Sequence, residues 1–171
     1  MKRLLIIVVA TALAAAAVHA EPPEESSKTT GWLYAGLGLG SHDFAAGASV
    51  NVKYIRFLGT LRATFMGSFS GGFFGPGEDV YDVGLLFGYC PIESLSIAAG
   101  VAKVGGERYH GLEWWLGRPP EYIDAIGVPI EVQFTPAKGR VVGLGIVGHV
   151  NINSEESFGG VTVGIELGTL K

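Results

Sequence analysis

Apolar and polar positions alternate along most of the chain with a period of two residues. The pattern is clearest in residues 160–168, where every second residue is Val, Ile or Leu and those between are Gly, Thr or Glu. Residues 142–153 repeat it. Successive side chains of a β-strand point to opposite faces, so this period predicts strands with one apolar face. No stretch after Thr30 shows the helical period.

Eight segments carry the alternation, and each is about ten residues long, the length that a tilted strand needs to cross a bilayer. An even number of such strands is typical of bacterial outer-membrane barrels. We therefore predict an all-β fold, an eight-stranded antiparallel up-and-down transmembrane β-barrel. The predicted strands are residues 31–40, 46–56, 59–69, 80–90, 95–105, 123–134, 142–153 and 160–168.

The predicted connections differ in length between the two ends of the barrel. Short connections are expected on the periplasmic side, together with the N-terminus of the barrel, and mostly longer loops on the outside. The short set is 57–58, 91–94 and 135–139, and the longer set is 41–45, 70–79, 106–122 and 154–159.

The two faces of each strand indicate which one meets lipid. One face carries Val, Leu and Ile, while the other is mostly Gly, Ala, Ser and Thr, which suit the narrow interior of eight strands. Charges are costly against lipid but acceptable when paired inside. We predict a luminal charge network that plugs the barrel, with a narrow pore as the alternative. Its members are Lys53, Arg62, Asp82, Glu131 and Glu166.

Aromatic residues gather near the predicted strand ends, where amphipathic rings anchor a barrel at the membrane interfaces. The segment 106–122 is the most distinctive, because its aromatic and arginine side chains also suit the recognition of a glycan or a partner. The predicted interface or surface-loop aromatics are Trp32, Tyr109, Trp114, Trp115 and Tyr122. Tyr34, Phe57, Tyr89 and Phe134 join Trp32 in the inner girdle, and Phe158 joins the outer one.

The amino-acid composition excludes or disfavours several other classes of protein. Glycine supplies 27 of 171 residues, more than twice its usual share of about 7%, which disfavours a helical domain. The net charge of −4 and the lack of a basic block disfavour nucleic acid as a partner. Cys90 is the single cysteine and excludes an internal disulfide. We predict no cofactor. We also predict no metal site, because the histidines and acidic residues of the loops are not spaced along the sequence as metal ligands usually are.

The N-terminal segment is predicted to be a secretory signal peptide. Lys2 and Arg3 precede an apolar run that ends in small residues, so cleavage is expected after Ala20. Residues 21–30 are polar and proline-bearing, which predicts a flexible periplasmic lead-in. The barrel is then expected to span residues 31–171.

In this pattern the chain resembles the small eight-stranded outer-membrane barrels of the OmpA and OmpX families, over roughly residues 31–171. The stretches GVPIEVQF (127–134) and NINSEESFGG (151–160) look like those of uncharacterised members. The resemblance implies a structural or surface-interaction role without catalysis. The implied partners of the folded barrel are outer-membrane lipid and lipopolysaccharide. During biogenesis, the implied partners are the barrel-assembly machinery and periplasmic chaperones. Unlike many members, the chain ends in Leu170 and Lys171 rather than an aromatic residue.

One constellation invites an enzymatic alternative. His149 lies two residues before Asn151 and upstream of Glu155 and Glu156, which resembles the His-x-Ser pair and later Glu of the lipid A deacylases. A serine nucleophile needs a neighbouring imidazole, and Asn151 cannot act as that nucleophile. The hydrolase alternative therefore requires another serine beside a His149 that faces lipid.

Overall fold

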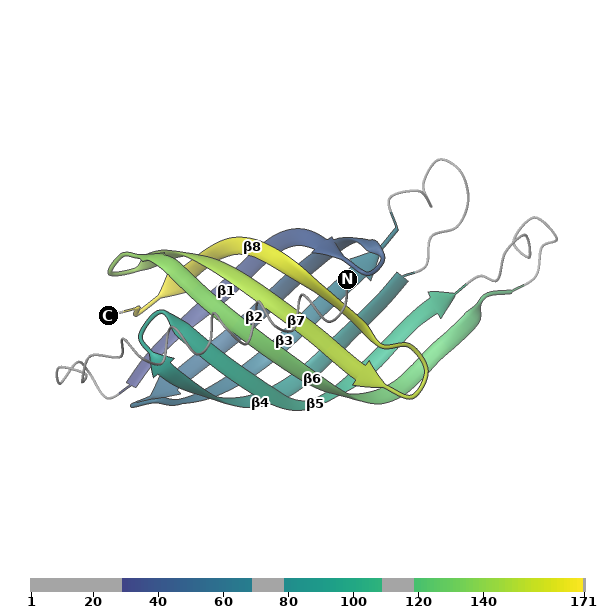
Figure 1. The fold of residues 1–171 in the computed structure, drawn as a ribbon, viewed down its shortest axis with the longest axis horizontal. Coiled ribbons are helices and arrows are strands. Elements are labelled where there is room, and N and C mark those ends of the chain that lie inside the picture. The colour runs from purple at the N-terminus through teal and green to yellow at the C-terminus, as the bar shows by residue number, and fades with distance from the viewer. Residues whose placement is uncertain (1–28, 69–78, 109–118, 171) are drawn as a thin grey trace, which may run out of the picture.

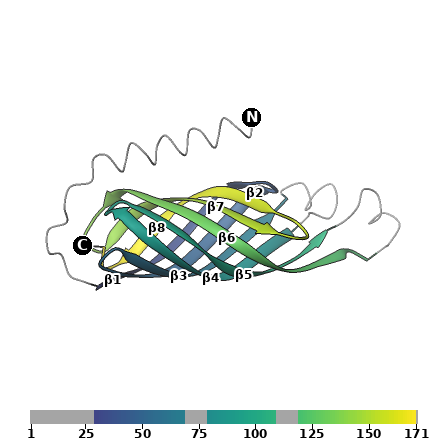
Figure 2. The ribbon, with the colours of Figure 1, turned by 60° about the horizontal axis from the view of Figure 1, so that its bottom comes forward.

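The computed structural model describes residues 29–68, 79–108 and 119–170, and these form one closed antiparallel barrel. Figures 1 and 2 show the strands inclined to the barrel axis. Among the described residues there is no helix long and apolar enough to span a membrane. The strands are β1 (Thr29–Gly40), β2 (Asp43–Tyr54), β3 (Phe57–Gly67), β4 (Asp79–Ile92), β5 (Leu95–Arg108), β6 (Glu121–Lys138), β7 (Val142–Asn153) and β8 (Phe158–Gly168).

Each strand pairs with the next along the chain, and β8 returns to pair with β1. This last seam runs from Trp32 opposite Gly168 to Gly40 opposite Gly160. Closure leaves no strand edge with unpaired backbone groups, which is the condition for crossing lipid with strands. The fold is therefore the predicted closed, eight-stranded antiparallel β-barrel.

The two ends of the barrel have different connections. At one end, here called the short-turn end, strands are joined by residues 55–56, 93–94 and 139–141. At the other, here called the long-loop end, the connections are residues 41–42, 68–78, 109–120 and 154–157. The predicted asymmetry is present, with one exception: the expected loop 41–45 is a two-residue turn.

The turns account for the shifted strand boundaries. Asp43 has φ 69° and begins β2 directly after the turn at residues 41–42. Ile55 has φ 60° in the turn between β2 and β3, which was expected at 57–58. Aspartate tolerates this left-handed region, whereas for a β-branched isoleucine it is unusual. Neither position carries the Asn-Gly or Asp-Gly signal that marks a tight hairpin in sequence, so the prediction missed both.

Strand β6 departs most from its predicted length. It runs without a break from Glu121 to Lys138, through Pro129, where a bulge or a shorter strand was expected. Pro129 is buried and lies opposite Asn151 on β7, but the pairing with β5 stops at Ile130 and resumes at Gly127, because proline has no N–H to donate. The register shift falls later, between Phe134 and Ala137.

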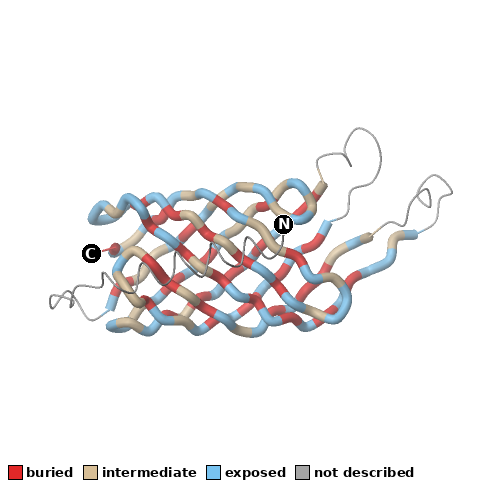
Figure 3. The backbone as a smooth tube through the Cα atoms, viewed as in Figure 1, coloured by how far each residue is buried: buried red, intermediate tan, exposed pale blue. Residues whose placement is uncertain are grey.

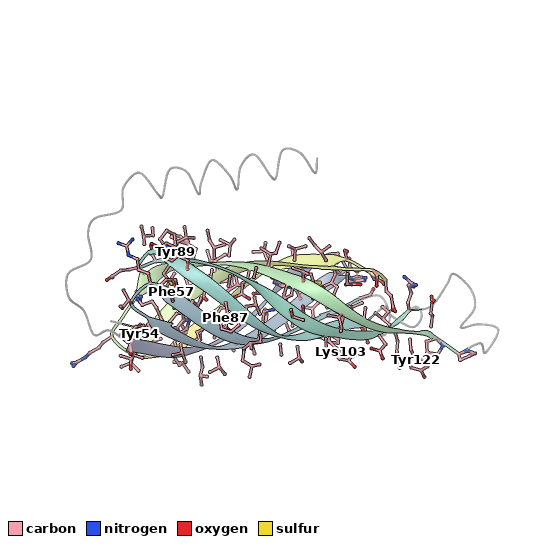
Figure 4. All side chains as sticks on the ribbon, turned by 90° about the horizontal axis from the view of Figure 1, so that it is seen from below. Tyr54, Phe57, Phe87, Tyr89, Lys103 and Tyr122 are labelled. Carbon is pink, nitrogen blue, oxygen red and sulfur yellow. The ribbon has the colours of Figure 1, made fainter. Side chains whose placement is uncertain are left out.

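The outer face is apolar, as the alternation predicts. Figure 3 shows buried and exposed positions alternating along the strands, and Figure 4 shows the outward side chains. In Figure 4, Tyr54, Phe57 and Tyr89 lie near the short-turn end and Tyr122 near the long-loop end. Phe57 and Tyr89 pack edge to face with ring centroids 6.1 Å apart.

Three aromatic residues do not belong to these girdles. Trp32 packs inside against the buried cluster around Leu58, and Tyr34 is buried and hydrogen-bonded to Thr162 on the neighbouring strand β8. Phe158 is 2% exposed and lies in the apolar cluster at the long-loop end. The girdle prediction was wrong for these three residues, because the parity of their own strands turns them inward.

Glycine allows the β1 and β8 backbones to approach closely. A Cβ on Gly38 would collide with the carbonyl oxygen of Val161, and one on Gly164 would collide with that of Ala35. Both glycines face the lumen, on the side predicted for them. The high glycine content thus serves this seam as well as the narrow interior.

Candidate functional site

The candidate site is a charged layer in the middle of the lumen, and β3 shows how the sequence places it. The inward side chains of β3 are Leu58, Thr60, Arg62, Thr64 and Met66. Leu58 belongs to the apolar cluster at the short-turn end, and Met66 to the one at the long-loop end. The strand therefore sets one cation between two apolar layers.

Arg62 joins two acids from different strands. Its Nη2 lies 2.6 Å from Oδ2 of Asp82 on the neighbouring strand β4. Its Nη1 lies 3.4 Å from Oε2 of Glu131 on β6. The Arg62 side chain is 2% exposed and that of Asp82 is fully buried, so the pair has been removed from solvent completely. Such a pair is tolerated only when hydrogen bonds satisfy its remaining atoms.

Asp82 receives those additional hydrogen bonds. Thr64 donates its hydroxyl to Oδ1 at 2.6 Å, and Asn151 donates its amide Nδ2 to Oδ2 at 2.6 Å. With Arg62, three donors from β3 and β7 hold this carboxylate in place. Thr64 and Asn151 were not predicted members, although both occupy polar inward positions that the alternation could have identified.

His149 completes the layer and bears on the hydrolase alternative. It lies opposite Glu131 in the β6–β7 register, is buried, and its Nε2 has no hydrogen-bond partner among the described residues. Glu155 and Glu156 bond elsewhere, to the backbone N–H of Asp124 and to the His42 side chain. A base for lipid cleavage would have to face the bilayer, so His149 does not fit that role.

Glu166 and Lys53 lie apart from Arg62. Glu166 Oε1 accepts hydrogen bonds from Gln133 Nε2 at 2.7 Å and from Thr135 Oγ1 at 2.8 Å. In the described part of the chain, neither Glu166 nor Lys53 forms a salt bridge. The structure thus brings three of the five predicted charges together and leaves the other two separate.

Lys53 lies at the short-turn end, beside a cavity of about 20 Å³ that Trp32, Cys90, Lys138 and Glu166 also line. A space of this size holds about one water molecule. Trp32 Nε1 and Gln133 Oε1 are buried without a partner within the described residues, and both residues border the cavity. The cavity is therefore suited to a water molecule rather than to an organic ligand.

A second ionic cluster lies at the long-loop end, and we call it the rim cluster. His42 Nε2 lies 2.6 Å from Oε1 of Glu156, whose Oε2 lies 3.4 Å from Nη1 of Arg108. Arg108 Nη2 also lies 2.8 Å from Oε2 of Glu121. The cluster links the β1–β2 turn, β5, β6 and the β7–β8 connection. Sequence reasoning missed it, because its members are far apart in the chain.

The described residues contain no group of three His, Cys, Asp or Glu side chains placed to hold a metal ion. Of the predicted surface aromatics, Tyr122 is exposed near the long-loop end. Tyr109, Trp114 and Trp115 lie outside the described residues, as do the predicted signal peptide and nearly all of the lead-in.

Comparison with known proteins supports the fold. No protein-family model and no curated protein sequence matches the chain. Among solved structures, it is similar to the N-terminal β-barrel domain of OprF from Pseudomonas aeruginosa, with a TM-score of 0.57 and 7% identity over 81% of this chain and 96% of that one. Ail, the attachment invasion locus protein of Yersinia pestis, in complex with the heparin analogue sucrose octasulfate, gives a TM-score of 0.46 and 11% identity over 82% and 97%. The chain therefore has the fold of the small, OmpA-like outer-membrane β-barrels.

Proposed function

We propose that this protein is a closed barrel of the bacterial outer membrane with a structural or surface-interaction role and without catalysis. Two features support the location: the continuous apolar outer face and the fold shared with the OprF barrel domain. Soluble proteins rarely expose contiguous apolar patches of more than a few hundred Å². An outer face of exposed Val, Leu, Ile and Phe side chains is therefore suited to lipid.

The observation that carries the proposal is the filling of the lumen by three successive layers. At the short-turn end lie Leu58, Leu86, Cys90 and Ala98, with Trp32 packed against them. Next comes the Arg62 layer, the charged layer formed by Arg62, Asp82 and Glu131. The long-loop end is filled by Ala45, Met66, Val80, Val104, Ile123, Ala125 and Phe158. An ion crossing the barrel would have to pass the apolar cluster at the long-loop end, to which β2, β3, β4, β5, β6 and β8 contribute, and break a buried salt bridge.

With the interior filled, interaction with other molecules falls to the outer face and to the ends. Lipid and lipopolysaccharide would contact the apolar face, and the assembly machinery and chaperones would act during biogenesis. Arg108 and Glu156 of the rim cluster connect β5 and β6 with the β1–β2 turn and the β7–β8 connection, which suits a firm base for a surface that other molecules contact.

Cell fractionation tests the proposed location. The full chain, expressed in a Gram-negative host, is expected in the detergent-extracted outer membrane, with a change of gel mobility on heating that reports a folded barrel. A periplasmic soluble barrel would instead be released with the periplasm by osmotic shock. Recovery in that fraction would contradict the proposal.

A further inference from the structure

A groove of about 720 Å³ crosses the outer face of five neighbouring strands, β8, β1, β2, β3 and β4. It follows one row of paired residues at inward-facing positions, of which three are glycines and the other two, Thr64 and Asp82, point their side chains into the lumen. From outside, the groove meets the backbone of this row and the outward side chains on either side of it. The row consists of Gly164, Gly36, Gly47, Thr64 and Asp82.

The floor of the groove is the backbone of this row, and most of the side chains that border it on β1, β2 and β3 are small. Ala35, Ala48 and Ala63 are direct neighbours in the register of β1, β2 and β3, and Ala46 lies on the other side of the row. The walls are Leu37, Phe65, Tyr81, Val83, Val163 and Ile165.

The groove is inclined in the membrane. On β4 it passes Asp82, the fourth residue from the long-loop end, whereas on β8 it passes Gly164, near the middle of the strand. Five strands about 4.8 Å apart make it about 19 Å long. With strands tilted by about 40°, it rises by roughly 12 Å, most of the about 15 Å thickness of one leaflet.

The width of the groove distinguishes a lipid chain from a protein segment. The outward residues on its two sides are two positions apart along each strand, which is about 7 Å. An α-helix with its side chains is about 10–12 Å wide and would rest on the bordering side chains without reaching the backbone floor. A single acyl chain is narrow enough to lie along the floor.

Polar groups lie at the upper end of the groove, nearest the long loops. Lys103 on β5 is the register partner of Val83 and is exposed on the outer face (Figure 4). Tyr81 lies opposite Gly105, and its ring occupies the space that a side chain at Gly105 would need. The Lys103 amine contacts the Asp124 carboxylate, which leaves two of its three donor hydrogens for another acceptor.

We propose that this groove binds one acyl chain of a phosphate-bearing membrane lipid, whose phosphate is held by Lys103 and the Tyr81 hydroxyl. The groove takes the chain, and the two donors lie where the headgroup of the leaflet on the long-loop side begins. The proposal rests on the membrane location proposed above.

Native mass spectrometry of the full-length barrel, released from detergent with added phosphatidylglycerol, tests the groove. The wild-type protein is expected to retain one lipid. Ala48→Phe fills the groove and is expected to lower the retained fraction about fivefold or more. Ala99→Phe is the matched control, because Ala99 is an exposed outward alanine on β5 beyond the groove, and retention should be unchanged.

The headgroup contacts are tested with a second pair of variants. Lys103→Gln is expected to reduce retention of phosphatidylglycerol but not of a diacylglycerol with the same chains. Asp124→Asn frees the lysine from its partner and is expected to retain phosphatidylglycerol at least as well as the wild type. Equal losses for both variants would overturn the assignment of the phosphate to Lys103.

Other outcomes would overturn the inference as a whole. Equal retention by Ala48→Phe and Ala99→Phe would show that lipid binds elsewhere, and a two-copy species abolished only by Ala48→Phe would assign the groove to a second chain. Ala46→Leu replaces Ala48→Phe if the latter loses its heat-dependent gel mobility. A wild-type barrel in the outer membrane that retains no lipid would refute this inference alone, whereas recovery in the periplasm would refute the proposed location.

Discussion

The Arg62 layer and the rim cluster use the same chemistry in different surroundings. In each, one arginine joins two carboxylates, Asp82 and Glu131 inside the lumen and Glu156 and Glu121 at the long-loop end. The arginine side chain is 2% exposed inside and 25% exposed at the rim. Water can therefore reach the Arg108–Glu121 pair at the rim, whereas the His42–Glu156 pair there, with side chains 9% and 17% exposed, is largely enclosed.

This difference separates what each cluster does for the fold. Removing one member of a buried pair leaves a charge without solvent, which costs about 3–5 kcal/mol. A solvated pair contributes about 0–1 kcal/mol and is weakened by salt. The inner layer therefore fixes how the strands pack across the lumen, while the exposed Arg108–Glu121 pair of the rim has a small effect on the stability of the barrel.

The largest effect is expected for Arg62→Met. The substitution leaves Asp82 and Glu131 buried without a cation, so the free energy of unfolding in lipid vesicles should fall by about 3–5 kcal/mol. Urea titration monitored by gel mobility measures the change. As a control, adding Asp82→Asn and Glu131→Gln removes the uncompensated charges and should restore most of the loss. A loss below about 1 kcal/mol for the single variant would mean that the layer is hydrated.

The next largest effect is expected on β8, where a substitution on the outer face is compared with one on the luminal face. Val163→Arg places a cation against lipid near mid-membrane and should cost about 2–4 kcal/mol. Thr162→Val, the adjacent luminal position, removes the 2.8 Å hydrogen bond to Tyr34 and should cost about 1 kcal/mol. The same urea titration applies to both. Similar losses at the two positions would contradict the assignment of inside and outside.

The smallest effect is expected at the rim. Glu121→Gln removes the charge that faces Arg108, in a pair whose side chains are 54% and 25% exposed, and should lower the free energy of unfolding by no more than about 1 kcal/mol. At 1 M salt the Debye length is about 3 Å, so the difference from the wild type should nearly vanish. A loss as large as that of Arg62→Met, and unchanged by salt, would place the rim cluster in a buried environment.

The sequence predicted the strands and their faces because a two-residue period has one physical meaning in a barrel. The same rule could have corrected the aromatic assignment. Leu33, Leu37 and Leu39 face outward on β1, so Trp32 and Tyr34 must face inward, yet their position near a strand end favoured a girdle. Strand parity is therefore a better guide than position along the strand.

The partners of the luminal charges could not be predicted in the same way. Parity places Arg62, Glu131 and Glu166 inside, but which acid meets the arginine depends on the register between strands and on the path across the lumen. Arg62 and Asp82 lie on β3 and β4, and Glu131 lies two strands further on, so no single tight-turn motif in the sequence sets their relative positions. The contacts of the rim cluster likewise form only when the closed barrel brings residues from distant parts of the chain together.

Single-channel recording of the purified wild-type barrel in a planar lipid bilayer tests the filled lumen most directly. The two apolar layers and the buried Arg62 salt bridges predict that no discrete conductance is observed, although the barrel inserts as judged by its heat-dependent gel mobility. Reproducible discrete openings of the wild-type protein would contradict a closed lumen and favour the narrow pore.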